Sequence, residues 1–305
     1  MSIAQQAIAV ARAPPAARPR RHVWRGALRR SEFTWALAFA MPYMAIFLAF
    51  VLYPIIYGIW MGSRPALYAQ LFDSPIYLTA LVNTLIFVGV GVNLKMALAF
   101  LLSGFFMRKR WWTKPLLVVF ILPWATPALP AFLSIHWMLN GTWGFLNSVL
   151  WELFNIEGPI WLIDRWLALG ANLTAYMWKQ LPFWTVIFLA GRMAIPQELH
   201  EAAAVDGATG LHRFRHITFP LLANLYLVCT LLSTIWTLGD FNAVFFISGG
   251  GPAMSTEVLA TLGIRYAFTL ANPQLGVAAV MSALPLLIPV VVVLFYKLRT
   301  ADVQL

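Results

Sequence analysis

The chain has 305 residues, of which 61% are hydrophobic and 10% are charged. Soluble domains carry about a quarter charged residues, so this composition excludes a soluble globular protein and indicates one embedded in a bilayer. The formal net charge of +10 does not indicate nucleic-acid binding, because the basic residues cluster between apolar runs. A single cysteine, Cys229, excludes an intramolecular disulfide.

Residues 1–32 are rich in Arg, Pro and Ala and have no apolar periodicity, which predicts a disordered basic arm. A twin-arginine export signal is the alternative, since Arg29 and Arg30 precede an apolar run and residues 38–40 have the pattern of a cleavage site. Too few residues separate the arginines from that site, however, and the apolar run continues far beyond it. Residues 301–305 are expected to form a short tail.

Six stretches are long enough to cross a hydrocarbon core, which needs about 20 apolar residues. They lie near residues 35–62, 78–106, 114–138, 168–194, 218–239 and 274–297. All are predicted to be helices, because lipid offers backbone amides no hydrogen-bond partner. The expected fold class is therefore an all-α membrane protein with six transmembrane helices in one domain, residues 33–300.

Lys and Arg residues are distributed unequally between the two ends of these spans. Sixteen lie in the N-terminal arm, the 107–114 turn, the 192–216 loop and the tail. The other loops hold three: Arg64, Arg165 and Arg265. By the positive-inside rule, both termini and the 192–216 loop face the cytoplasm. The outer loops are then residues 63–77, 139–167 and 240–273, of which the Trp-rich second is expected to lie along the membrane surface.

The loop at residues 195–217, between the fourth and fifth spans, begins at Pro196 and contains Glu201-Ala-Ala-Ala-Val-Asp206-Gly207. Pro196 suits a first helical position, alanine is the best helix former, and Gly207 suits the left-handed residue that ends a helix. The pattern predicts a short helix, a tight turn and a second helix entering the fifth span. Alanines on an outward face would suit docking in a groove of a cytoplasmic partner. An ordinary amphipathic helix between spans is the alternative.

This loop resembles that of the permease subunits of bacterial ABC importers, whose hallmark is Glu-Ala-Ala, three residues, Gly, nine residues, then Ile-x-Leu-Pro. The residues that carry the resemblance are Glu201, Ala202, Ala203, Asp206, Gly207, Ile217 and Pro220. Phe219 stands where the family usually has Leu. The resemblance covers about residues 35–300 and implies a type I ABC importer permease fold. It also implies that the loop forms the coupling helix, which sits in a cleft of the ATP-binding subunit.

Two stretches resemble the carbohydrate, or maltose-type, branch of that family: Asp206-Gly207-Ala208, and the outer-loop segment from Phe241 through Ser248-Gly249-Gly250-Gly251-Pro252 to Glu257. The resemblance implies import of a mono- or oligosaccharide or related polyol across the bacterial inner membrane. It also implies three kinds of partner: a second permease chain, a dimer of ATP-binding subunits, and a periplasmic or extracellular solute-binding protein.

The sequence has no Gly-rich phosphate loop ending in Lys-Ser or Lys-Thr. We therefore expect no cofactor in this chain and no enzymatic activity of its own. ATP and Mg would be bound by the partner ATPase subunits.

Polar and aromatic residues recur at helical spacing in the fourth and fifth spans. A lysine at the centre of a membrane helix costs about 2.5–3.5 kcal/mol on insertion scales, so each such residue needs a reason. Sugars suit a cleft of aromatic rings and hydrogen-bonding groups, and the resemblance places substrate contacts on these spans. The candidate pathway residues are Tyr176, Lys179, Gln180, Phe183, Ser233, Trp236 and Thr237.

The structural alternative is that Lys179 pairs with Asp240 or with a backbone carbonyl, and that the aromatic rings only pack against neighbouring helices. Lys95 is expected to be structural or to face the second permease chain. Three further polar residues are candidates for hydrogen bonds between helices: Asn83, Asn93 and His136.

Three other functions remain open from the residues. An ion-gradient-driven secondary transporter would show internal repeats and acidic residues near the membrane midplane. A membrane-embedded enzyme would need converging catalytic groups, and the five histidines show no metal-ligand pattern in a span. An ABC permease for a non-carbohydrate solute would share the loop but not the substrate.

Overall fold

The computed structural model describes residues 30–108, 110–208 and 210–301, which form helices and turns and contain no β-strand. Most of the predicted basic arm and residues 302–305 lie outside the described residues. The chain divides into two compact units, residues 1–55 and 56–305. We describe each unit by itself.

The first unit contains helix α2 (Arg30–Phe47), which begins two residues before the predicted end of the arm, and the π-helical turn η1 (Leu48–Leu52). The helical segment Trp35–Gly62 is 28 residues long with a mean hydropathy of 2.1, and it matches the first predicted span. Large apolar side chains are exposed along it, including Phe39 and Phe50. A helix that is apolar all round is stable only in lipid or against a partner.

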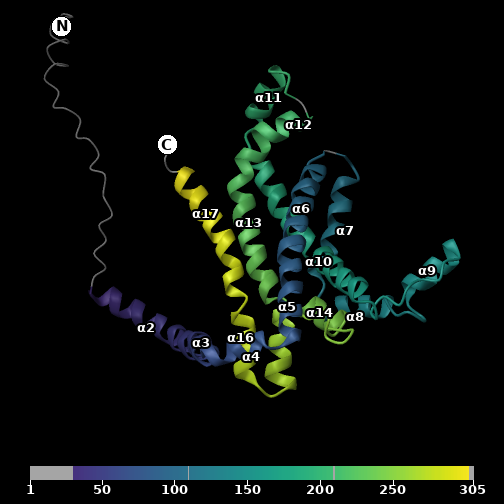
Figure 1. Ribbon diagram of the computed structural model, residues 1–305. Coiled ribbons are helices and arrows are strands. Elements are labelled where there is room, and N and C mark those ends of the chain that lie inside the picture. Colours follow the sequence, from purple (N-terminus) through teal and green to yellow (C-terminus); the bar gives the residue numbers. More distant parts are fainter. Residues whose placement is uncertain (1–29, 109, 209, 302–305) are drawn as a thin grey trace, which may run out of the picture. The chain divides into compact units, whose positions relative to one another are not determined.

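The second unit contains the remaining elements, shown in Figure 1. Helix α3 (Tyr53–Gly62) crosses the division between the two units. Before the 195–217 loop the other elements are α4 (Pro65–Phe72), α5 (Pro75–Ile86), η2 (Phe87–Val92), α6 (Asn93–Phe106), α7 (Thr113–Ala125), α8 (Ala128–Met138), α9 (Phe145–Phe154) and α10 (Arg165–Met193). After it come α11 (Gln197–Val205), α12 (Gly210–Arg213), η3 (Phe214–Thr218), α13 (Phe219–Gly239), α14 (Asn242–Ile247), α15 (Leu259–Ile264), η4 (Arg265–Thr269), α16 (Pro273–Met281), η5 (Leu284–Leu287) and α17 (Ile288–Ala301).

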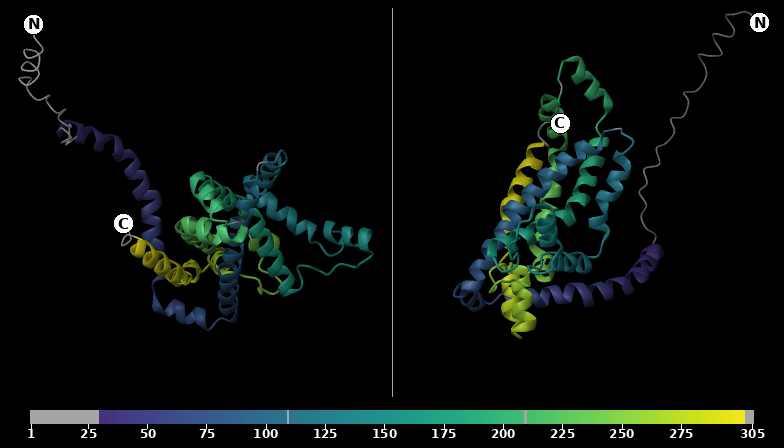
Figure 2. Two further views of the ribbon diagram at one scale, coloured as in Figure 1. Left: turned by 90° about the horizontal axis from the view of Figure 1, so that it is seen from above. Right: turned by 90° about the vertical axis from the view of Figure 1, so that its right-hand side faces the viewer.

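In the second unit, α10 packs against α6, α7 and α13, and α13 also packs against α17. Figures 1 and 2 show α11 and α12 beyond one end of these helices, whereas α8, α14 and α16 lie at the other end. Where α6, α10 and α13 meet, a cluster of buried apolar side chains includes Phe100, Trp184 and Leu222. Gly91 in η2 allows close packing, because a Cβ there would lie 2.7 Å from Leu173 Cδ1.

The predicted third span, residues 114–138, is not one straight helix. It consists of α7 and α8, which are bent by 95°. The break has a local cause, since a proline disfavours the helical conformation of the residue before it. Thr126 precedes Pro127 and has an extended backbone with ψ of 144°.

Among the described residues, four helical segments are long and apolar enough to cross a membrane, or five if α7 and α8 together count as one span. The segments besides Trp35–Gly62 are Pro75–Phe106, Gly210–Gly239 and Pro273–Val293. The fourth predicted span, residues 168–194, lies within α10 except for its last residue. Helix α10 has 29 residues but carries buried polar side chains such as Asn172 and Lys179. The number of spans therefore stays a prediction. Helix α10 packs against α6, α7 and α13.

Candidate functional site

The predicted helix and turn of the 195–217 loop are present as α11, a left-handed residue and α12. Gly207 has a φ of 75°, as expected of a residue that ends a helix. Its N–H donates to the carbonyl of Ala204 at 3.1 Å, and Ala208 N–H donates to the carbonyl of Ala203 at 2.8 Å. These two bonds satisfy carbonyls at the end of α11. Pro196 differs from the prediction, because it caps the helix with a ψ of 134° and Gln197 begins it.

The outward surface of α11 is made of small and acidic residues. Ala202, Ala204 and Glu201 are exposed, whereas Ala203 is buried, so the expectation that the alanines all face outward is wrong for that residue. Asp206 and Gly207 are also exposed. A helix presenting this surface at the end of a bundle leaves room for a partner groove.

The remaining residues of the importer pattern lie where the loop joins the bundle. Ile217 is half-buried in η3, and Pro220 is exposed in the first turn of α13. Phe219, the departure from the family pattern, packs edge-on against the Phe100 ring, with the ring centres 6.1 Å apart. The aromatic ring therefore contributes to the packing of α13 on α6.

Three of the candidate pathway residues, one of them through its backbone carbonyl, belong to a chain of hydrogen bonds that links α6, α10 and α13. Lys95 Nζ donates to the Tyr176 hydroxyl at 2.7 Å, and that hydroxyl lies 2.6 Å from Thr237 Oγ1. Thr237 Oγ1 donates to the carbonyl of Ser233 at 2.6 Å, so Tyr176 donates to Thr237. Lys95 is 1% exposed, and its ammonium group lies inside the chain rather than on a partner-facing surface.

Lys179 has a different environment at the break between α7 and α8. Its Nζ donates to the carbonyls of Pro123 at 3.1 Å and Thr126 at 2.5 Å. The last carbonyls of a helix have no partner within it and form the negative end of its dipole. The Lys179 ammonium group therefore caps α7. The sequence left open whether Lys179 pairs with Asp240 or with a backbone carbonyl, and the structure shows pairing with carbonyls. Asp240 instead accepts hydrogen bonds from Asn242.

The aromatic members of the pathway set lie together at the α10–α13 contact. The Phe183 ring stacks on Trp124 of α7 with the ring centres 5.3 Å apart, and it lies 5.3 Å from the Trp236 ring. Trp236 and Phe183 are both partly exposed, as is Gln180, whereas Ser233 is buried. The seven predicted residues thus divide into a buried group of four and a more accessible group that comprises Gln180, Phe183 and Trp236.

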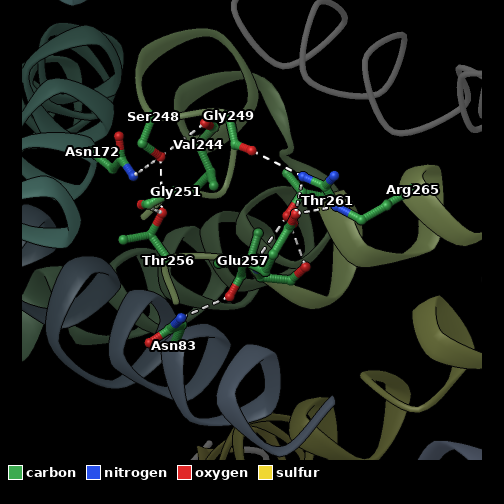
Figure 3. Close-up of polar contacts among 11 residues, drawn as sticks. Asn83, Asn172, Val244, Ser248, Gly249, Gly251, Thr256, Glu257, Thr261 and Arg265 are labelled. Atoms are coloured by element: carbon green, nitrogen blue, oxygen red, sulfur yellow. Dashed lines mark hydrogen bonds and ion pairs between the residues drawn. The ribbon is translucent and has the colours of Figure 1, made fainter. Parts of the chain in front are cut away.

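A further polar cluster lies in the loop between α14 and α15, within the predicted outer loop 240–273 (Figure 3). Glu257 is 0% exposed, and its Oε1 accepts from Arg265 Nε at 2.6 Å. Arg265 Nη2 also donates to the carbonyl of Gly249 at 2.9 Å. Asn83 of α5 donates to the carbonyls of Ser255 and Glu257 at 2.9 and 2.8 Å. These bonds fasten the loop to α5 and η4.

A second set of bonds fastens the same loop to α10. Asn172 Nδ2 donates to Ser248 Oγ at 2.8 Å, and Ser248 Oγ lies 2.9 Å from Thr256 Oγ1. Thr256 Oγ1 donates to the carbonyl of Gly251 at 2.6 Å. The sequence named this segment only through its resemblance to sugar permeases and did not predict the buried carboxylate. An acidic residue in a polar, Gly-rich loop is usually solvated, so no local signal distinguished Glu257.

The three candidate interhelical hydrogen bonders behave differently. Asn83 makes the loop contacts described above, and the His136 Nδ1 of α8 lies 2.6 Å from the carbonyl of Ile247 in α14. Asn93 donates instead to Gly89 in the preceding turn of its own helix, at 2.7 Å. Two of the three therefore connect separate elements.

Comparison with known proteins connects this architecture to one family. A family described as binding-protein-dependent transport system inner membrane component matches residues 95–299. The chain is 36% identical, over 48% of its length and 50% of the relative's, to the trehalose/maltose transport system permease protein MalF of Thermococcus litoralis. It is 34% identical, over 63% of its length and 62% of the relative's, to the sulfoquinovosyl glycerol transport system permease protein SmoG of Agrobacterium fabrum.

The chain thus spans about half to two thirds of the length of the curated relatives it matches. Among solved structures, it is similar to a chain in the crystal structure of a bacterial ABC transporter involved in the import of the acidic polysaccharide alginate. The TM-score is 0.75 at 21% identity, over 88% of this chain and 96% of that chain. On the family match over residues 95–299, this chain belongs to the binding-protein-dependent transport system inner membrane components.

Proposed function

We propose that the chain is a permease subunit of an ATP-driven importer that carries a sugar, or a related polyol, across the bacterial inner membrane. The observation that carries the proposal is α11, whose exposed Glu201 and Ala202 precede a left-handed Gly207 at the end of the bundle. The family match supports a role in binding-protein-dependent transport. The names of relatives, which include a trehalose/maltose and a sulfoquinovosyl glycerol permease, support a carbohydrate substrate.

In this proposal the cytoplasmic partners supply the energy. Two ATP-binding subunits bind ATP and Mg, and closure of their dimer moves α11, which docks in a cleft of one of them. Because α11 is joined directly to α10 and through α12 and η3 to α13, its displacement moves the two helices that carry the candidate pathway residues. The spans then alternate between an inward-open and an outward-open state, whose populations are biased by nucleotide.

The substrate would pass beside the α10–α13 contact. The partly exposed rings of Phe183 and Trp236 offer apolar faces to the C–H groups of a sugar ring, and Gln180 offers hydrogen bonds to hydroxyl groups. Tyr176, Lys179, Ser233 and Thr237 are buried behind them and would hold this surface in place. The other half of the pathway would come from a second permease chain, and a periplasmic or extracellular solute-binding protein would deliver the sugar.

Ala202→Trp tests the coupling role, because Ala202 is exposed and an indole there blocks docking without disturbing the core. The matched control is Ala66→Trp in α4, also at an exposed alanine but in a predicted outer loop. Each variant is reconstituted with its ATPase, permease partner and binding protein in liposomes. We expect Ala202→Trp to reduce sugar-stimulated ATP hydrolysis by at least about tenfold, which is about 1.4 kcal/mol of coupling, and Ala66→Trp to leave it unchanged.

Undiminished hydrolysis in Ala202→Trp would refute the coupling role of α11. The substrate class is tested separately with the unaltered complex, by measuring hydrolysis against a panel of sugars, polyols, amino acids and inorganic ions. Stimulation by a member of the last two groups, with none by any sugar or polyol, would refute the carbohydrate assignment. Uptake that continues without ATP but stops when the proton gradient is dissipated would refute ATP-driven import.

A further inference from the structure

A cavity lined by basic side chains lies between the ends of α6 and α10 and the α11–η3 segment. Its volume is about 400 Å³, and its basic lining residues are Arg108, Arg192, His200 and Arg213. The other lining residues are Gly104, Met107, Ile195 and Thr218. No acidic side chain lines it, so three guanidinium groups share one concave space without a counter-charge in the described wall. We call it the basic cavity.

Arg192, in the last turn of α10, is fixed in position within this cavity. The residue is 8% exposed, its Nε donates to Ser103 Oγ at 2.7 Å, and its Nη2 donates to the carbonyl of Phe100 at 3.0 Å. Its guanidinium carbon also lies 4.5 Å from the centre of the Phe100 ring. These contacts are all with neutral groups, and Arg192 has no ion pair among the described residues. Its positive charge is therefore held rigidly and is not neutralised.

The other basic groups approach from separate elements. Arg108 follows the end of α6, and Arg213 ends α12. Neither makes an ion pair in the part of the chain that the structure describes. His200, on α11, has a buried Nδ1 without a hydrogen-bond partner. Buried polar atoms usually have a hydrogen-bond partner, and a ligand in the cavity that His200 lines would supply one.

This arrangement suits an anion with several oxygen atoms. Guanidinium groups present paired N–H donors that match phosphate geometry, and charge-assisted bonds of this kind are the strongest that side chains make. The cavity lies at the end of the bundle predicted to face the cytoplasm, where basic pockets between membrane helices bind lipid head groups. Exposed Met107, which lines the cavity, and exposed Met193, which follows Arg192 in the chain, offer apolar surface for an acyl chain.

We propose that the basic cavity binds a phosphate group, supplied by an anionic phospholipid head group or by a soluble phosphate. Because its walls belong to α6, α10, α11 and α12, a bound phosphate joins the coupling helix to the ends of the bundle. Occupancy then stabilises the position of α11 relative to α10. The site is separate from the sugar pathway and from the docking surface of α11.

The test uses the full chain purified in detergent and two double variants with the same change in net charge. Arg108→Gln/Arg213→Gln removes two cavity arginines and retains Arg192, whose packing is part of the core. Arg110→Gln/Arg215→Gln removes two exposed arginines next to them that do not line the cavity. Binding is measured by native mass spectrometry during titration with dioleoylphosphatidylglycerol, with dioleoylphosphatidylcholine for comparison, and in a second arm with inorganic phosphate. Thermal unfolding of both variants confirms that they are folded.

We expect the cavity variant to bind its anion at least about tenfold more weakly than the unaltered chain, and the control variant to bind with unchanged affinity. Tight binding of phosphatidylglycerol alone identifies a lipid head group as the source, whereas binding of inorganic phosphate with the same variant pattern identifies a soluble phosphate. Equally weakened anion binding in both double variants would mean that binding depends on the general surface charge, and it would overturn the proposal. Absence of specific binding of either probe to the unaltered chain would also overturn it.

Discussion

Tyr176 connects a buried ammonium group to the rest of the helix bundle. Tyr176→Phe removes the only oxygen to which Lys95 Nζ donates among the described residues and removes a donor to Thr237. A buried charged donor without a partner costs about 1–3 kcal/mol or more. The variant is therefore expected to lower the thermal unfolding midpoint in detergent by roughly 2–4 °C for each kcal/mol lost.

Thr237→Val is the comparison for this prediction. It removes one hydroxyl at the far end of the chain of bonds but leaves Lys95 paired with Tyr176. We expect its midpoint to fall less than that of Tyr176→Phe. A Tyr176→Phe variant as stable as the unaltered chain would show that Lys95 does not depend on the phenol.

Gly250 illustrates how the loop between α14 and α15 restricts a single position. Its φ is 81°, and a Cβ there would collide with the buried Glu257 carboxylate. Gly249 has a similar φ of 62° but open space around its Cβ position. Both alanine variants bear the backbone strain of a left-handed L-residue, about 1–2 kcal/mol, and Gly250→Ala adds an overpacking cost of about 1–3 kcal/mol.

Limited proteolysis of the loop measures the difference between these variants. Gly250→Ala should be cleaved faster than Gly249→Ala, because displacement of Glu257 also breaks its bond to Arg265. Equal cleavage rates would mean that the carboxylate moves aside without cost and that the cluster does not hold the loop.

At the scale of elements, the break between α7 and α8 depends on a side chain from a third helix. Lys179→Met keeps most of the apolar stem but removes the donors to the Pro123 and Thr126 carbonyls. Because a hydrogen bond to a charged group contributes about 1.5–3 kcal/mol, we expect a lower unfolding midpoint. If the role of Lys179 is only to cap α7, the folded variant should keep the same sugar preference in transport. A change in preference with unchanged stability would instead place Lys179 on the substrate pathway.

Local sequence rules predicted most of these helices and the turn after α11. Apolar length located α5 with α6, α13 and α16 with α17, and the Ala-rich run followed by Gly207 predicted the α11 turn. The break at Thr126 was missed because a hydropathy window averages over Pro127, although the restriction that proline places on its preceding residue was a usable signal. The length of α10 was underestimated at its start, where Asp164 caps it by accepting from two backbone N–H groups at 2.9 Å.

The candidate site was predictable only where it depends on local spacing. The positions of Glu201 and Gly207 follow from helix periodicity and turn chemistry. Whether Lys95 contacts a partner chain, or Glu257 is solvated, depends instead on which helices pack together. That information lies in contacts between residues far apart in the sequence, such as Asn83 with Glu257. Helical spacing placed Tyr176 and Lys179 on one face of α10. It could not predict that Tyr176 accepts a hydrogen bond from Lys95 whereas Lys179 caps α7.

At the scale of the whole molecule, the account requires a cytoplasmic α11 joined to the spans that form the pathway. The unequal distribution of Lys and Arg predicts this orientation, and the exposed surface of α11 fits a docking role. If α11 lay on the outer side, neither an ATPase nor the cytoplasmic leaflet could reach it. The membrane side of α11 is therefore the property on which coupling depends.

Labelling of one introduced cysteine tests this property most directly. Cys229→Ala removes the native thiol, and Val205→Cys places a new one at a position that is 89% exposed on α11. Ala66→Cys, in a predicted outer loop, is the control for the opposite side. With a membrane-impermeant maleimide, the account predicts labelling of Val205→Cys only in inside-out vesicles and of Ala66→Cys only in right-side-out vesicles. Labelling of Val205→Cys in sealed right-side-out vesicles would contradict it.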